Sequence, residues 1–209
     1  MDKIKLGVLV GGTSIEREVS KKSCENLLAN LDENKYDITV YHLPADGNTE
    51  WAKNIISNPP QIVLSALHGG NGENGSIQGF LHCLNIPYIG SKVLSSAICM
   101  NKAMAKTVMK ANHIQVPDHV FVMRGVDFSQ YEESIKLMGF PLIVKPNRGG
   151  SSIGVIVARN MEDIHYGIKN IMETYDDDVL IEKFIDGKEI NCCVLQGENG
   201  PEAMAVLDV

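Results

Sequence analysis

The first part of the chain alternates short apolar runs with segments of helix-forming residues. Residues Ile4–Val10 form a continuous apolar run that ends at two glycines, as expected of a central strand in a parallel sheet. Two more strands and two helices are predicted here, the strands at Ile38–His42 and Ile62–Leu67 and the helices at Arg17–Leu31 and Trp51–Ser57. This repetition predicts a small doubly wound, Rossmann-like α/β sheet, in which ligands bind at the carboxyl ends of the strands.

Beyond Gly90–Val93 the pattern changes, and consecutive strands replace the regular alternation of strand and helix. Helices are predicted at Val93–Asn112, with a break near Met100-Asn101, at Ser129–Met138, and at Met161–Tyr175 with Asn160 as its N-cap. Strands are predicted at His119–Val122, Leu142–Lys145, Gly154–Val157, Val179–Lys183, Glu189–Leu195 and Ala203–Val209. The second part is therefore predicted to be α+β, with a domain boundary near Gly90–Val93.

Composition and charge argue against two classes of protein. The 209 residues are 44% hydrophobic and 22% charged, as in ordinary globular proteins, and carry a net charge of −7. This negative charge argues against a nucleic-acid-binding protein, whose affinity depends on basic side chains. No apolar run approaches the roughly 20 residues of a transmembrane helix, and the N-terminal run lacks a signal-peptide cleavage pattern. We therefore expect neither nucleic acid nor a membrane as a partner.

The cysteines indicate a reducing compartment. They are five in number and lack CxxC spacing, at Cys24, Cys83, Cys99, Cys192 and Cys193. Four of them lie in apolar-patterned segments, which predicts buried free thiols in a cytoplasmic protein. The same spacing gives no sign of a zinc site.

The segment Pro146–Gly154, PNRGGSSIG, joins two predicted strands and is rich in glycine and serine. Successive amides in a glycine-rich turn form a concave anion site. Lys145 ends the preceding apolar strand, where an unpaired charge is costly, and a triphosphate is a suitable partner for it. An ordinary hairpin with a solvated lysine is equally compatible with this segment alone. The spacing excludes a Walker P-loop, and no GxGxxG follows the first strand.

Other segments accompany this loop in a fixed order. Met100-Asn101-Lys102 opens a predicted helix, Val179–Phe184 is an apolar strand that ends in Glu182-Lys183, and Gly187-Lys188-Glu189 follows. The set resembles the ATP-grasp superfamily, in which two α+β subdomains hold ATP between them. The resemblance implies phosphate contacts from Lys102, Lys145, Gly149, Gly150, Ser151 and Ser152, adenine contacts from Glu182, Lys183, Phe184 and Ile185, and ribose contacts from Glu189.

Two N-terminal segments narrow the resemblance. Gly11–Ser20, GGTSIEREVS, and Ala66–Gly79, ALHGGNGENGSIQG, closely resemble the D-alanine–D-alanine ligases. The resemblance implies that Glu16 holds the ammonium of a first D-alanine, that Ser151 is its hydrogen-bonded companion, and that His68 lies beside the same substrate. Taken singly, Glu16 could equally be a first-turn acid favoured by the helix dipole.

The resemblance implies a reaction and a division of labour. Residues 1–92 would bind the first D-alanine, residues 93–180 would carry the phosphate loop, and residues 181–209 would begin a second ATP-grasp subdomain. The family joins two D-alanines through an acyl phosphate for peptidoglycan precursor synthesis, with ATP and Mg²⁺ or Mn²⁺. Glu16 and Ser151 would be its catalytic residues here, and we expect a homodimer.

The metal ligands are expected beyond Val209, in a stretch with an Arg-x-Asp segment and a Glu-x-Asn motif. Glu189-Ile190-Asn191 matches the Glu-x-Asn motif, but its position fits the acid that binds ribose. Arg124–Phe128 precedes the phosphate loop and has the wrong spacing for the Arg-x-Asp segment. We therefore expect a C-terminally incomplete ATP-grasp domain that is inactive as it stands. Two alternatives remain: a non-catalytic nucleotide-binding pseudo-ligase, and a ligase that takes D-serine or D-lactate second. An open reading frame past Val209 would favour the enzyme.

Overall fold

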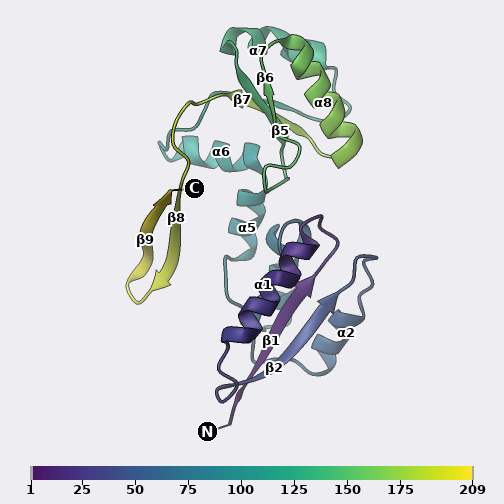
Figure 1. The fold of residues 1–209 in the computed structure, drawn as a ribbon, viewed down its shortest axis with the longest axis vertical. Helices are drawn as coiled ribbons and strands as arrows, with labels where there is room; N and C mark the ends of the chain where they lie inside the picture. The colour runs from purple at the N-terminus through teal and green to yellow at the C-terminus, as the bar shows by residue number, and fades with distance from the viewer. Residues whose placement is uncertain (1, 209) are drawn as a thin grey trace.

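The computed structural model describes residues 2–208. Its N-terminal part is built on a parallel sheet of β1 (Ile4–Gly11), β2 (Tyr36–Leu43) and β3 (Ile62–Ser65), in the order β2-β1-β3 (Figure 1). The helices of this part are α1 (Arg17–Asn30), α2 (Glu50–Ser57), α3 (Gly70–Glu73) and α4 (Ser76–Cys83). In register, Leu9 of β1 faces Tyr41 on one side and Ser65 on the other.

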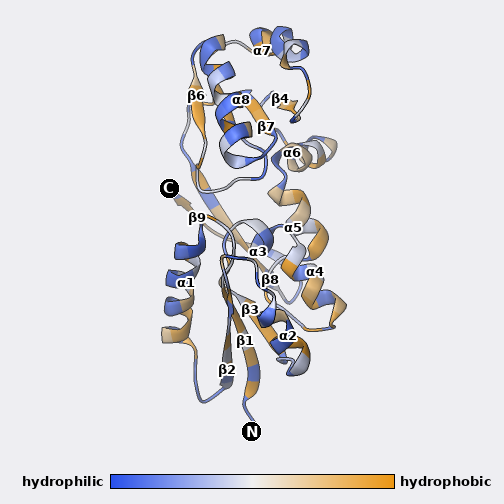
Figure 2. Ribbon diagram, turned by 90° about the vertical axis from the view of Figure 1, so that its right-hand side faces the viewer, coloured by the Kyte–Doolittle hydropathy of each residue, from blue (hydrophilic) through white to orange (hydrophobic). Residues whose placement is uncertain are grey.

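The alternation of side chains along β1 explains why helices cover both faces of this sheet. Leu6, Val8 and Val10 point to one face, where they pack against α1. Leu9 points to the other face and packs against Ile55 of α2 and the apolar side of α4. Figure 2 shows the strands between α1 and α2, with α1 largely hydrophilic on its outside. The predicted doubly wound α/β sheet is confirmed.

Helices α3 and α4 are absent from the sequence prediction. They are not predicted because the segment GGNGENGS is rich in glycine, which has a low helix propensity. Gly75, with a φ of 93°, forms a left-handed turn just before α4. A Cβ atom there would lie 2.7 Å from the Val93 carbonyl oxygen, so this close approach requires glycine.

Two helices link the first sheet to the second, α5 (Val93–Met100) and α6 (Lys102–Ala111) (Figure 1). The break between them lies at Asn101, as predicted. The Oδ1 atom of Asn101 accepts a hydrogen bond from the Met104 amide, 3.0 Å away, and so caps α6.

The second sheet is antiparallel and has the order β4-β7-β5-β6. Its strands are β4 (His119–Val122), β5 (Leu142–Pro146), β6 (Ile156–Ala158) and β7 (Val179–Lys183). One face packs against the 3-10 helix η1 (Phe128–Tyr131), α7 (Glu132–Met138) and α8 (Met161–Tyr175). The predicted N-cap of α8 is confirmed, since Asn160 accepts from the Asp163 amide. The predicted α+β character is confirmed.

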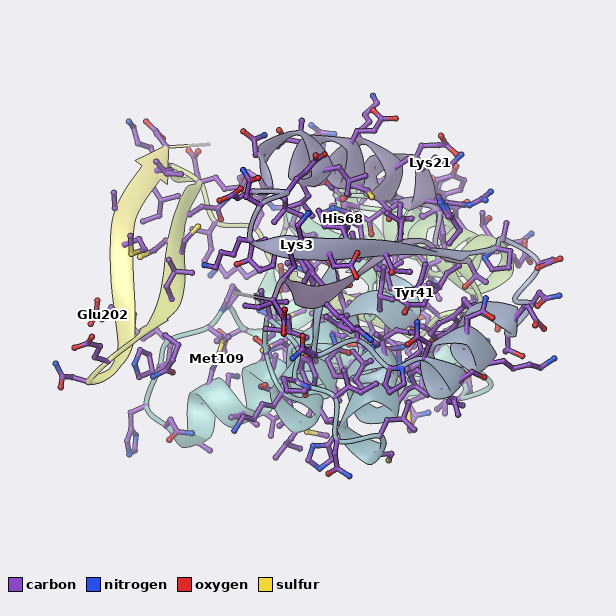
Figure 3. The ribbon with its side chains drawn as sticks, turned by 90° about the horizontal axis from the view of Figure 1, so that it is seen from below. Lys3, Lys21, Tyr41, His68, Met109 and Glu202 are labelled. Carbon is purple, nitrogen blue, oxygen red and sulfur yellow. The ribbon has the colours of Figure 1, made fainter. Side chains whose placement is uncertain are left out.

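The last two strands form a hairpin of their own. Strands β8 (Ile190–Gly197) and β9 (Gly200–Asp208) pair with each other and, within residues 2–208, with no other strand. Figures 1 and 3 both show this hairpin standing away from the two sheets. Val209, the last residue of the predicted final strand, lies outside the described residues.

The cysteine prediction is wrong in one respect. Cys24 is buried on the inner face of α1, but the other four thiols are exposed, at Cys83, Cys99, Cys192 and Cys193. Apolar neighbours misled the prediction, because Cys83 ends a short helix and Cys192 and Cys193 lie on the free hairpin. Among the described residues, no helix has the length and apolar character that crossing a bilayer requires.

Candidate functional site

The two halves of the chain meet where the loop after β1 touches the loop between β5 and β6. The Ser151 hydroxyl donates a hydrogen bond to Oε1 of Glu16, although 135 residues separate them along the chain. A Cβ atom on Gly150 would lie 3.6 Å from the other Glu16 carboxylate oxygen. The predicted partners Glu16 and Ser151 are therefore brought together by the fold.

Gly69 packs against the other side of Glu16, in a backbone conformation that favours glycine. Gly69 follows β3 with a φ of 64°, and a Cβ there would lie 2.3 Å from Oε2 of Glu16 and 2.6 Å from the Ser14 hydroxyl. The Ser14 hydroxyl in turn accepts a hydrogen bond from the Glu16 amide at 3.1 Å. Glu16 is thus held between the ends of two parallel strands and the glycine-rich loop, at the sheet edge where ligands bind by default.

The glycine-rich loop has an unusual backbone conformation. Ser151 and Ser152, which are not glycines, have φ values of 49° and 56°, and Gly154 follows with 73°. A non-glycine residue in this left-handed region costs about 1–2 kcal/mol. Such conformations cluster at ligand clamps, and a glycine-rich turn of this kind presents its amides to an anion. The predicted hairpin connection is confirmed, since β5 and β6 pair antiparallel.

Lys102 ties α6 to this loop. Its Nζ atom donates to the carbonyl oxygens of Pro146, at 3.1 Å, and of Gly149. Asn147 completes the link, because its side chain accepts from the Ala103 amide at 2.9 Å. Burial lowers the pKa of Lys102, and the nearby charge of Lys145 lowers it further.

Lys145 has a protein partner, Glu182, in the absence of any ligand. Ile143 of β5 pairs with Glu182 of β7, so Lys145 and Glu182 lie diagonally on the same face of the sheet and form an ion pair. The sequence predicts a triphosphate in this role, and strand pairing supplies a carboxylate as well. Glu182 is only 10% exposed.

Lys106 is the second partner of Glu182, and the sequence prediction missed it. Its Nζ atom lies 2.8 Å from Oε2 of Glu182, and its side chain is 13% exposed. Burial opposes ionisation of Glu182, but the paired charges of Lys106 and Lys145 outweigh it and hold the pKa of this carboxyl below its usual value. The available signal was the spacing Lys102-x-x-x-Lys106, which places both lysines on one face of a helix.

The lowered pKa of Glu182 predicts a pH-dependent stability. A carboxyl with a depressed folded pKa stabilises above its ordinary pKa, 4.5 for Glu182, and loses that contribution as pH falls through the folded value. We expect the difference in unfolding free energy between the native chain and Glu182→Gln to be constant near neutral pH and to shrink below pH 4.5. Urea unfolding at a series of pH values measures it, with the exposed Glu189→Gln as control. A difference that stays constant down to the acid limit contradicts the ion-pair assignment.

The predicted adenine and ribose residues lie on the segment that leaves β7. The Lys183 amide donates to the Asp118 carbonyl at 2.9 Å, and the Phe184 amide donates to that of Pro141 at 3.3 Å. Ile185 is 65% exposed, and Glu189 is also exposed. The structure therefore places Lys183 and Phe184 at the end of the inner strand β7, with both of their amides already engaged.

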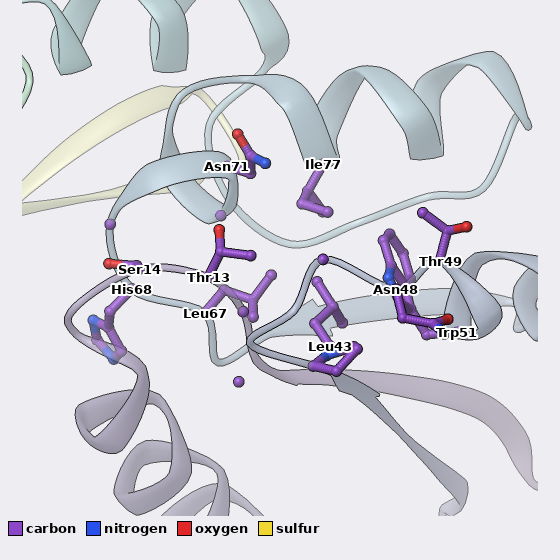
Figure 4. Close-up of a pocket in the computed structure, with 16 residues that line it drawn as sticks. Thr13, Ser14, Leu43, Asn48, Thr49, Trp51, Leu67, His68, Asn71 and Ile77 are labelled. Carbon is purple, nitrogen blue, oxygen red and sulfur yellow. The ribbon is translucent and has the colours of Figure 1, made fainter. Parts of the chain in front are cut away.

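His68 and Glu16 line different cavities, although His68 Nδ1 lies 3.8 Å from Oε1 of Glu73, which lines the cavity of Glu16. His68 lines a cavity of about 140 Å³ at the end of the first sheet, together with Trp51 and Ile77 (Figure 4). Its Nε2 atom is 2.8 Å from the Ser23 hydroxyl. Glu16 instead lines a neighbouring cavity of about 400 Å³ that also includes Gly149 and Gly150. His68 and Glu16 thus occupy adjacent cavities that share a wall.

The match to known families follows the same two halves. The model of the family "D-ala D-ala ligase N-terminus" matches residues 49–91, and that of "D-ala D-ala ligase C-terminus" matches residues 108–209. A D-alanine–D-alanine ligase of Bacillus anthracis is 40% identical over 199 residues, which are 95% of this chain and 63% of that protein. The chain belongs to the D-alanine–D-alanine ligase family.

Solved structures of this ligase family share the fold. A Bacillus anthracis D-alanine–D-alanine ligase complexed with ATP has a TM-score of 0.84 at 34% identity, covering 98% of this chain and 65% of its own. A D-Ala:D-Ser ligase of Enterococcus faecalis has the same TM-score at 27% identity, covering 99% of this chain and 70% of its own. The chain spans 63% of the length of the curated Bacillus anthracis relative.

Proposed function

We propose that this chain binds ATP and D-alanine for the ATP-dependent ligation of two D-alanines to D-alanyl-D-alanine, a step of peptidoglycan precursor synthesis. The observation that carries this proposal is the contact between Glu16 and Ser151. It sets an acid from the first sheet against the glycine-rich loop of the second, where an amine and a phosphate can lie side by side. The ligase relatives and the ATP complex of one of them support it.

The proposed chemistry has two steps. The carboxylate of the first D-alanine attacks the γ-phosphorus of ATP, the bond to the bridging oxygen breaks, and ADP leaves. The amine of the second D-alanine then attacks the acyl phosphate carbonyl, and phosphate leaves with loss of a proton from the amine. Lys102, Lys145 and the Gly149–Ser152 loop would stabilise the charge on the transferring phosphoryl group. Glu16 would hold the ammonium of the first substrate, which is catalysis by orientation.

The remaining nucleotide contacts follow from the same proposal. Lys183, Phe184 and Ile185 would meet the adenine, with the ionised Glu182 as acceptor for its amino group. Glu189 would accept hydrogen bonds from the ribose hydroxyls. His68 would lie near the first D-alanine.

Magnesium belongs to the proposed reaction, but the described residues do not fit it. Within residues 2–208, no group of three or more histidine, cysteine, aspartate or glutamate side chains is placed to hold a metal ion. Mg²⁺ is usually held by carboxylates together with substrate phosphates. The acid of the loop region, Glu182, already neutralises two lysines. We therefore assign no step to magnesium in this chain.

The organisation we propose is a D-alanine-binding unit at residues 1–92, a phosphate-binding unit at 93–180 and a further nucleotide-binding subdomain from residue 181. We place the protein in the cytoplasm and propose a homodimer, which sedimentation equilibrium tests.

The Enterococcus faecalis neighbour favours a second candidate, a ligase that takes D-serine as second substrate. A third is a nucleotide-binding pseudo-ligase, and detectable D-alanine binding counts against it.

Glu16→Gln tests the substrate assignment. With ATP present, we expect the Kd for D-alanine to rise about tenfold, because the variant loses a charge-assisted hydrogen bond to the ammonium. Isothermal titration or ligand-observed NMR measures it. Glu18→Gln is the matched control, since Glu18 lies two residues further on, in the first turn of α1, and is exposed and paired with Lys21. D-alanine binding that Glu16→Gln leaves at the native level overturns the assignment.

A further inference from the structure

Glu182 is shared by two lysines from different elements. Lys145 of β5 pairs with one carboxylate oxygen, and Lys106 of α6 pairs with the other at 2.8 Å. Glu182 is 10% exposed and Lys106 13%, so water screens this cluster poorly. One carboxylate therefore faces two positive charges, one more than is needed to neutralise it.

The second lysine matters once a triphosphate arrives. If Lys145 moves from Glu182 to a phosphate, Glu182 loses one partner while it stays buried. A buried carboxylate left without any partner is strongly destabilising. That penalty would be subtracted from the affinity for phosphate. Lys106 removes it, because it remains on the other oxygen of Glu182.

Contacts within the protein hold the helix that carries Lys106. Helix α6 begins against the glycine-rich loop, where the Lys102 amide donates to the Asn147 carbonyl at 3.0 Å and the Ala103 amide to the Asn147 side chain at 2.9 Å. Lys106 lies one turn further along the same helix, beside Lys102. The start of the helix is thus fixed on the loop, and Lys106 is aimed at β7 from a rigid element.

We propose that Lys106 is a positioning residue that neutralises and holds Glu182 so that Lys145 is free to bind phosphate. This inference rests on the proposed ATP site and adds a residue to it that touches no phosphate itself. The pairing of Lys106 with Glu182 also affects which nucleobase the site accepts. Lys106 keeps Glu182 ionised and therefore an acceptor only, which suits the amino group of adenine and opposes the carbonyl oxygen of guanine.

The experiment compares ATP with adenosine, and the ratio of the adenosine Kd to the ATP Kd isolates the phosphate contribution. In Lys106→Met we expect this ratio to fall about tenfold, because Lys145 stays with Glu182. In Lys106→Met/Glu182→Met we expect it to return to within about threefold of the native ratio, because no buried carboxylate remains to retain Lys145. Lys110→Met, one turn further along the same helix at an exposed position, is the matched control and should keep the native ratio.

Each outcome decides something. A ratio that Lys106→Met leaves unchanged overturns this inference, and so does a double variant no better than the single one, which would indicate direct contact of Lys106 with phosphate. If Lys106→Met does not fold, Lys106→Gln carries the same expectation, since it keeps a donor without the charge. A native chain that binds ATP no more tightly than adenosine overturns the proposed phosphate site itself. ATP binding with an unaffected Lys106 variant overturns only the role of Lys106.

Discussion

Lys145→Met is expected to weaken ATP binding by this chain between about 10- and 100-fold, since a hydrogen bond to a charged group contributes about 1.5–3 kcal/mol. Lys145 is the side chain best placed to leave its present partner for a phosphate. It is the penultimate residue of β5, beside the glycine-rich loop, and its side chain is 20% exposed. The fold should survive, because Glu182 keeps Lys106 as its partner.

Isothermal titration of ATP into the two chains measures this effect. Lys136→Met is the matched control, because Lys136 lies on α7 in an exposed pair with Glu132 and should leave ATP affinity at the native level. An equal loss in both variants would point to net charge and not to a phosphate site. If Lys145→Met binds ATP as tightly as the native chain, the assignment of Lys145 to the phosphate site is wrong.

Glu182→Gln is expected to lower the free energy of unfolding by about 3 kcal/mol, because removing one partner of a buried ion pair leaves the other charge uncompensated. Here the substitution leaves both Lys106 and Lys145 without their acid. The glutamine fills the same volume, so packing changes little, and the lost free energy of unfolding measures the effect of removing the charge.

Urea unfolding at neutral pH measures this loss, and Glu132→Gln provides the contrast. Glu132 pairs with Lys136 on the surface of α7 at 2.8 Å, a geometry as close as that of Lys106 and Glu182. An exposed pair contributes about 0–1 kcal/mol, so the two variants should differ by roughly 2 kcal/mol or more. Similar losses in both would mean that Glu182 is solvated in solution.

Much of this fold is predictable from local pattern. The apolar run of β1 and the N-cap of α8 are confirmed at or near their predicted ends, because both depend on residues adjacent in sequence. Helix α4 is different. The glycine-rich segment before it predicts a loop. The helix forms because Ile77 and Leu81 complete the hydrophobic core beneath β1. Tertiary packing overrides propensity there.

The candidate site divides in the same way. The loop, Lys145 and Glu16 follow from sequence motifs, and the structure brings Glu16 against Ser151. The lysine-glutamate cluster does not follow, because it depends on the register of β5 with β7 and on the approach of α6 to the sheet. A sequence shows neither. The placement of His68 and Glu16 in different cavities is likewise a property of the folded strand ends.

A crystal structure of this chain with a non-hydrolysable ATP analogue and D-alanine tests the central claim most directly. The account predicts the triphosphate against Lys145, Lys102 and the amides of Gly149–Ser152, with the ammonium of D-alanine on Glu16. It also predicts that Glu182 keeps Lys106 and loses Lys145. A triphosphate bound elsewhere, with the glycine-rich loop empty and Lys145 still on Glu182, would contradict it.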